Sequence, residues 1–210
     1  ASPTSLSIAN SGGTANFAND ITVTGVTALN SGTLAILAGK TCTLNGTTTW
    51  SGTALTGGGT FVFNLGGTTT AGVPKLYGST LNLPAGQTYV DSYNAGGGSV
   101  ELRSGAVINN AGTWEYLGDR NIFNGLAPMS SFNNTGTFTK RSNTSSTVSL
   151  QIPFNNSGTV NASAGTLRMT GQSFTQTAGQ LVLNGGIIRT SLGLPLLIQG
   201  GAVTGSGTIE

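Results

Sequence analysis

Acid–base chemistry in this chain of 210 residues depends on six carboxylates, because the chain contains no histidine. Four of the six lie between residues 91 and 120, together with Arg103 and Arg120. Glu101 and Glu115 each stand between two apolar residues, and at a separation of ~5 Å they would resemble the carboxylate pair of a retaining glycosidase. Fourteen residues separate them, which is less than one coil of the repeat described below. We therefore interpret them as surface charges paired with Arg103 and Arg120, and we predict no catalytic residue.

The composition excludes several further kinds of site. Without histidine there is no Ser-His-Asp triad and no histidine-ligated metal. A single cysteine, Cys42, allows neither an internal disulfide nor a thiolate cluster, and its alternation with Leu44 predicts a buried side chain. The net charge of +2 comes from scattered residues and gives no footprint for nucleic acid. We expect no enzyme activity, no metal, no cofactor, no nucleic-acid partner and no membrane span.

Aromatic side chains offer a second kind of chemistry, because their rings can stack on sugars. Trp114 aligns with Phe138 and Val160 in the repeat, so we expect it in the core. Four other aromatic residues have no such alignment and could form a glycan-binding surface: Trp50, Tyr77, Tyr89 and Tyr93. The alternative is that they are scattered surface residues.

Threonine pairs of the form Thr-x-Thr could form a flat ice-binding face if one pair stood on every coil. Such pairs occur at Thr22/Thr24, Thr41/Thr43 and Thr68/Thr70, and then only at Thr137/Thr139 and Thr175/Thr177. The alternative is threonine on a solvated sheet face, where its β-branched side chain is favoured.

A repeated motif determines which elements must carry all these side chains. Three segments align without gaps as apolar-Asn-Asn-small-Gly-Thr-apolar: 108–114, 132–138 and 154–160. A looser form, in which Gly or Ser and usually Thr precede apolar-x-apolar, returns roughly every 20 residues along most of the chain. Alternation of period two predicts short strands, and the frequent Gly, Thr and Ser argue against helices.

An in-register repeat favours a solenoid over an antiparallel sandwich, because each coil of a solenoid places like residues over like residues. We predict an all-β, right-handed parallel β-helix of about ten coils and no helices. Residues 1–30 follow the repeat least well, so we expect an irregular N-terminal coil or cap before solenoid repeats over 31–210.

The paired asparagines should form ladders of stacked amides, each hydrogen-bonded to the coils above and below. The glycine that follows each pair should supply the positive φ of a corner. The predicted ladder consists of Asn109, Asn110, Asn133, Asn134, Asn155 and Asn156, and the predicted corner glycines are Gly112, Gly136 and Gly158.

Residues 154–210 contain Asn-Asn-Ser-Gly-Thr-Val, Ala-Gly-Thr-Leu-Arg-Met and Gly-Ser-Gly-Thr-Ile. This region resembles the passenger repeats of secreted bacterial β-helix proteins of the adhesin, haemagglutinin-like and autotransporter-like group. The resemblance implies a secreted, extracellular or cell-surface location and a β-helical shaft used in adhesion or in a biofilm matrix. It implies no catalytic residues.

The ends of a solenoid expose unpaired strand edges, which template the addition of further strands. The stretch 187–209 contains one charged residue, Arg189. We therefore expect a structural module that forms a filament or adhesin shaft, with a head-to-tail copy or a larger parent polypeptide as partner. The alternatives are a β-helix that binds or cleaves a surface glycan and, third, an ice-binding protein.

Overall fold

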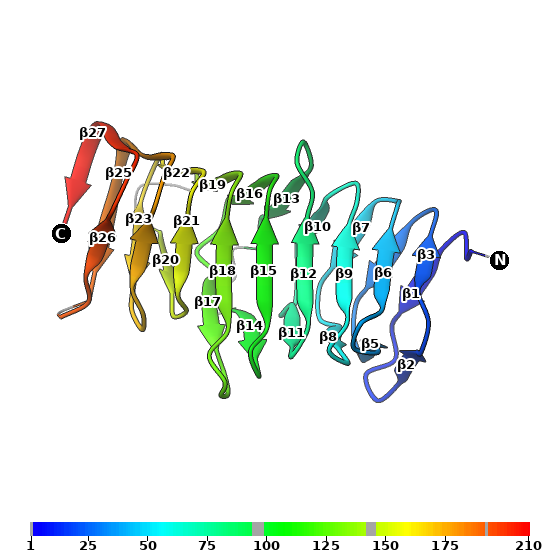
Figure 1. Cartoon of the computed structure of the whole chain (residues 1–210). Coiled ribbons are helices and arrows are strands. Elements are labelled where there is room, and N and C mark those ends of the chain that lie inside the picture. Colours follow the sequence, from blue (N-terminus) through cyan, green and yellow to red (C-terminus); the bar gives the residue numbers. More distant parts are fainter. Residues whose placement is uncertain (1, 94–98, 142–145, 192) are drawn as a thin grey trace.

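The computed structural model describes residues 2–93, 99–141, 146–191 and 193–210. These residues form 27 short β-strands and no helix. Along most of the chain each strand pairs in parallel with the third strand after it, one coil further on, as β1 does with β4. The protein is thus an all-β parallel β-solenoid, which confirms the predicted fold class (Figure 1).

The solenoid has three faces. Face 1 consists of β1 (Leu6–Ile8), β4 (Thr27–Leu29), β7 (Thr48–Trp50), β10 (Gly67–Thr69), β13 (Thr88–Asp91), β16 (Thr113–Tyr116), β19 (Thr137–Lys140) and β22 (Thr159–Ala162). Face 2 consists of β2 (Thr14–Phe17), β5 (Thr33–Ile36), β8 (Ala54–Thr56), β11 (Lys75–Tyr77), β14 (Ser99–Arg103), β17 (Asn121–Asn124), β20 (Thr147–Leu150) and β23 (Thr166–Met169).

Face 3 is a separate nine-stranded sheet. It consists of β3 (Ile21–Val23), β6 (Thr41–Leu44), β9 (Thr60–Phe63), β12 (Thr80–Leu83), β15 (Val107–Asn110), β18 (Ser131–Asn134), β21 (Phe154–Asn156), β24 (Phe174–Gln176) and β26 (Leu196–Ile198). The longer strands β25 (Gln180–Thr190) and β27 (Ala202–Ile209) run across faces 1 and 2 and join them into one sheet.

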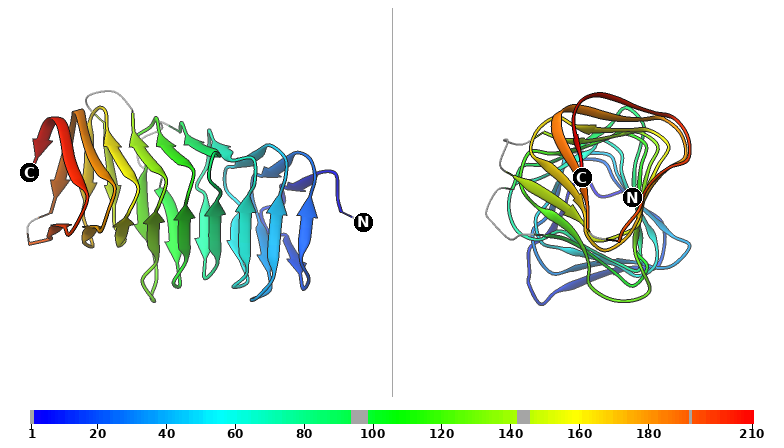
Figure 2. Two further views of the ribbon diagram at one scale, coloured as in Figure 1. Left: turned by 45° about the horizontal axis from the view of Figure 1, so that its top comes forward. Right: turned by 90° about the vertical axis from the view of Figure 1, so that its left-hand side faces the viewer.

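The coils stack along one axis, with the two termini at opposite ends (Figure 2). In Figure 1 the strands of face 3 run upward in front while the chain advances from right to left, which is the sense of a right-handed coil. One strand of face 3 per coil gives about nine turns, close to the predicted ten. Coils differ in length because their connections differ: the residue spacing between paired positions ranges from 19 to 28.

Side chains alternate between the interior and the surface along each strand, as in the inward Trp114 and Tyr116 and the outward Glu115 of β16. Apolar side chains from all three faces form one continuous core. Phe154 stacks between Phe132 and Phe174, with ring centroids 5.0 and 5.6 Å apart. The predictions that Trp114 and Cys42 are buried are both confirmed.

Residues 1–30, for which the sequence predicts an irregular coil or cap, contain a coil of three strands. The strands β1, β2 and β3 pair in register with β4, β5 and β6, so residues 6–23 form a regular first coil and β4 begins the second. The strands of the first coil are three or four residues long and partly exposed, since no earlier coil covers them in the part of the chain that the structure describes.

Candidate functional site

The asparagine pairs form two ladders on face 3. The inner ladder faces the core, where Asn110, Asn134 and Asn156 occupy one column of the sheet and are each 1% exposed. The Asn110 amide donates to Asn134 Oδ1 at 2.7 Å, and the Asn134 amide donates to Asn156 Oδ1 at 2.8 Å. The same amides also donate to the backbone carbonyls of the next coil, at Thr137 and Thr159. Neighbouring coils are therefore hydrogen-bonded through side chains inside the core as well as through their backbones.

The outer ladder occupies the position just before the inner one on each strand and faces outward. Asn109 donates to Asn82 Oδ1, Asn133 to Asn109 Oδ1 and Asn155 to Asn133 Oδ1, each at 2.9 Å. Each outer amide donates to the preceding coil, whereas each inner amide donates to the following coil. All six predicted ladder asparagines thus lie where the repeat placed them.

Two ladder residues were missed because they lie outside the repeated motif. Asn82 begins the outer ladder, and Gln176 ends the inner one by accepting from Asn156 at 3.1 Å and donating to the carbonyls of Gly200 and Ala202. At the other end of the inner column Leu83 precedes Asn110. Within the described part of the chain, the buried Asn110 Oδ1 has no hydrogen-bond partner. Both Asn82 and Gln176 could have been identified by extending the strand register by one coil beyond the repeated motif, since each is the register partner of a ladder asparagine.

The glycines after the asparagine pairs have a different role from the one predicted. Gly112, Gly136 and Gly158 do not adopt positive φ. Instead, a Cβ atom on Gly136 would lie 2.1 Å from the carbonyl oxygen of Gly112, and one on Gly158 would lie 2.1 Å from that of Gly136. These corners lack side chains because successive coils approach each other too closely for a Cβ atom.

A buried ion pair lies near the corner between faces 1 and 2. The Arg120 Nε atom is 3.2 Å from Asp91 Oδ2, and both side chains are fully shielded from solvent. Arg120 also donates to the carbonyl of Gly72 at 2.7 Å and lies over the ring of Tyr93 at 4.4 Å. One guanidinium therefore connects segments of three coils. Sequence patterns do not indicate this contact, because Arg120 lies outside the strands.

Burial governs ionisation in this region. It raises the pKa of Asp91 to about 6, although Arg120 opposes the shift. Burial also raises the pKa of Tyr89 and of Tyr116 well above the usual range of tyrosine. It lowers the pKa of Lys140 to about 8, with the charge of Asp119 opposing. These side chains lie inside the solenoid, where the Tyr89 hydroxyl is hydrogen-bonded to that of Thr69 in the preceding coil.

The two candidate carboxylates lie on different faces, Glu101 on face 2 and Glu115 on face 1. Arg103 binds Glu101 in an ion pair, as expected, whereas Glu115 pairs with Arg141 at 3.0 Å instead of Arg120. The structure therefore does not bring them together as a glycosidase pair. Within the described residues no group of three or more His, Cys, Asp or Glu could hold a metal ion.

The four candidate glycan contacts separate into two groups. Trp50 and Tyr89 are fully buried, so neither can meet a sugar at the surface. Their rings pack against each other, with centroids 6.4 Å apart. Tyr77 and Tyr93 are half-buried. Tyr77 lies on β11 of face 2, and Tyr93 lies in the connection that follows β13 of face 1. The sequence could not show which of these rings face inward, because none of the four belongs to a repeated motif that indicates the inward positions of its strand.

The threonine pairs also divide between faces. Thr22 and Thr43 are neighbours on face 3, whereas Thr68 and Thr139 lie on face 1. Between Thr43 and Thr175, Val62 and the outer ladder asparagines fill the column of face 3. The Thr-x-Thr pairs therefore do not form one continuous array.

Both end coils leave apolar inward side chains without a covering coil in the described part of the chain. In the last coil Val203 continues the inward column of Leu181, Ile209 continues that of Ile188, and both are close to half exposed, at 44% and 46%. In the first coil Leu6 and Phe17 pack only partly against the core. Each end thus presents an apolar cross-section surrounded by strand edges.

Together, the fold and the ladders define the class of protein as a three-faced parallel β-solenoid. Comparison with family profiles, with curated proteins and with solved structures found no match. A search of the described residues for a helix long and apolar enough to cross a membrane found none.

Proposed function

We propose that this chain is a secreted structural module, a β-solenoid that forms part of an extracellular filament or matrix or of the shaft of a surface adhesin. The observation that carries the proposal is the pair of open ends, with apolar inward residues at Val203 and Ile209 on one side and Leu6 and Phe17 on the other. An added coil, from adjoining polypeptide or from a second copy, would bury these side chains and pair the free edges.

The interior chemistry supports the same role. The inner ladder, the stacked phenylalanines and the buried Asp91–Arg120 pair all connect one coil to the next along the axis. Such contacts make a rod resistant to separation of its coils, which a shaft requires. Contacts between one end and the other are heterologous, so they propagate instead of closing.

Sedimentation velocity and electron microscopy of the purified chain over a range of concentrations test end-to-end association. We expect rods that lengthen with concentration. Val203→Lys, which places a charge at the inward position of the last coil, should abolish the lengthening. Thr204→Lys, one residue along β27 and facing outward, is the matched control and should leave it intact. Monomers at all concentrations would overturn association between copies.

The location of the protein requires a separate experiment. An antibody against the chain should detect it in the culture medium or on the surface of cells of the source organism. Its retention inside intact cells would contradict the proposed secretion.

A further inference from the structure

Face 2 carries a compact array of charged and aromatic side chains on its outer surface, across three consecutive coils. In register, Lys75 of β11 lies beside Glu101 of β14, and Glu101 lies beside Phe123 of β17. Two positions further along the strands, Tyr77 lies beside Arg103. The array comprises Lys75, Tyr77, Glu101, Arg103 and Phe123, with Gly125 at its edge.

Hydrogen bonds hold the centre of the array in one arrangement. The Tyr77 hydroxyl donates to Glu101 Oε2 at 2.6 Å, and Arg103 Nε donates to Glu101 Oε1 at 2.7 Å. The guanidinium of Arg103 also lies over the Tyr77 ring, 4.9 Å from its centroid. Because both contacts orient the same guanidinium, little conformational entropy remains to be lost when a ligand binds it.

The array carries excess positive charge. Arg103 and Lys75 are basic, and Glu101 is its one acid. Among the described residues Lys75 has no hydrogen-bond or ion-pair partner, and the Nη1 group of Arg103 has none either. These groups are available to a negatively charged ligand.

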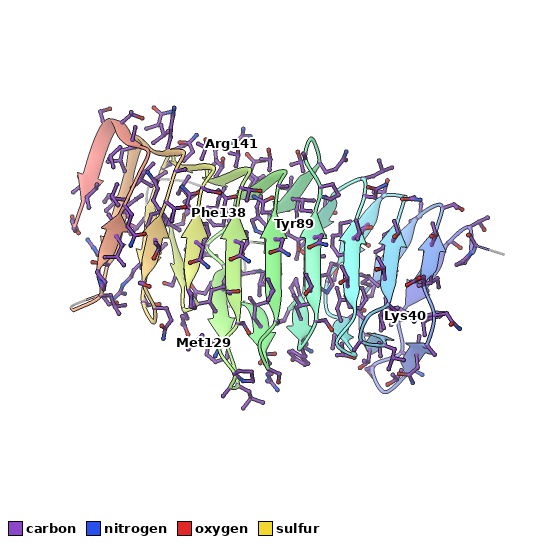
Figure 3. The ribbon with its side chains drawn as sticks, in the orientation of Figure 1. Lys40, Tyr89, Met129, Phe138 and Arg141 are labelled. Atoms are coloured by element: carbon purple, nitrogen blue, oxygen red, sulfur yellow. The ribbon has the colours of Figure 1, made fainter. Side chains whose placement is uncertain are left out.

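An open apolar surface adjoins the guanidinium. Phe123 is 38% exposed, and Leu126 and Met129 on the following turn are more exposed still. Figure 3 shows Met129 projecting from that turn. Gly125 carries no side chain, and a Cβ atom there would lie 2.8 Å from Arg103 Nε. The Arg103 side chain thus occupies the space over Gly125, two residues along the chain from the exposed Phe123.

We propose that this array is a binding site for an acidic saccharide, a chain that contains hexuronic acid. The apolar side of a pyranose ring packs on Phe123, and its carboxylate accepts hydrogen bonds from Arg103, with Lys75 adding electrostatic attraction. A peptide bound by strand addition is disfavoured, because β11 and β14 already pair on both edges. Recognition here must come from side chains, and those present suit a charged sugar.

Titration of the 15N-labelled protein with tetragalacturonate, followed by amide chemical shifts, tests the site. We expect shifts centred on residues 75, 77, 101, 103 and 123, and weaker binding at high salt. Phe123→Ala and Arg103→Gln should each weaken binding about tenfold. The fully methyl-esterified tetrasaccharide, which has the same rings without the charge, should bind at least about tenfold more weakly.

Arg168→Gln is the matched control, because Arg168 is an exposed outward arginine on the same face, at β23. It should leave the affinity unchanged. Urea unfolding midpoints close to wild type would show that the Phe123 and Arg103 variants are folded. Equal losses in the Arg168 variant would show only general attraction between charges and overturn the site, as would equal binding of the ester or the absence of shifts on face 2.

Discussion

The side-chain amide of Asn133 donates toward the N-terminal end of the solenoid, to Asn109, whereas that of its neighbour Asn134 donates toward the C-terminal end, to Asn156. The two amides lie on opposite sides of face 3, since successive side chains leave opposite sides of a sheet. Asn134 lies in the core and Asn133 is half-buried at the surface, so the two ladders differ in how much a lost hydrogen bond should cost.

We expect Asn134→Leu to lower the free energy of unfolding by about 2–4 kcal/mol. Leucine fits an inward position of this column, where Leu83 already stands, but the substitution leaves Asn156 Oδ1 and the Thr159 carbonyl without their donor. Asn133→Ser, on the outer ladder, should cost less than about 1 kcal/mol because water can replace the lost contact. Urea unfolding followed by circular dichroism measures both.

The end of the inner ladder provides an internal control. Asn110 Oδ1 has no partner among the residues that the structure describes, so Asn110→Leu removes an unsatisfied acceptor as well as one link. It should therefore destabilise the chain less than Asn134→Leu. Equal costs for the Asn110, Asn133 and Asn134 variants would show that the ladders contribute nothing specific.

We expect Gly136→Ala to destabilise the solenoid by more than about 2 kcal/mol, since the added Cβ atom would overlap the Gly112 carbonyl and force two coils apart. Gly12→Ala is the control, because its Cβ would meet nothing within 4 Å and its φ is not positive. Gly39→Ala has open space but a φ of 75°, so it isolates the conformational cost, about 1–2 kcal/mol. Thermal unfolding should rank Gly136 as the most sensitive position and Gly12 as the least; a small effect at Gly136 would refute close coil contact.

The repeated motif was sufficient to predict the parallel coils, their register and the six ladder asparagines, because a residue that recurs in register must lie over its own copies. The corner glycines were placed correctly but explained wrongly, since the sequence does not reveal how closely two coils approach. The sequence could not show that Tyr89 is buried and Tyr77 is not, because the side to which a strand residue points depends on where the strand begins and ends. The Arg120–Asp91 pair depends on the path of a connection, which no strand pattern describes.

Buried Asp91 should make stability depend on pH. Its pKa is about 6 in the folded chain and 3.8 when exposed, so between these values the native state binds a proton that the unfolded state does not. The stabilisation is fully present below about pH 4 and is lost as the pH rises through 6. We expect the difference in unfolding free energy between wild type and Asp91→Asn to fall over this window by up to about 3 kcal/mol.

The two tyrosines that interact with Asp91 titrate outside that window, because burial raises the pKa of Tyr89 and of Tyr116 well above the usual range of tyrosine. Lys140 lies beyond Tyr116 in the same column, and burial lowers its pKa only to about 8. Urea titrations at half-unit steps from pH 3.5 to 7 would resolve the Asp91 contribution. Parallel curves for wild type and Asp91→Asn would mean that Asp91 does not titrate in this range.

Cys42 should report the opening of the N-terminal coils. Its side chain is fully buried on β6, between Ile21 of β3 and Phe61 of β9, and burial raises the pKa of its thiol to about 12. Because the thiolate is the reactive form, the native chain should resist a disulfide reagent such as 5,5′-dithiobis(2-nitrobenzoate) at pH 8. The chain unfolded in urea should react with one equivalent at once.

At intermediate urea concentrations the labelling rate should follow the loss of β-structure, since exposure of Cys42 requires separation of face 3 strands. Stoichiometric labelling within minutes in native buffer would contradict the burial of Cys42, whereas labelling ahead of the spectroscopic transition would show that the first coils open before the rest.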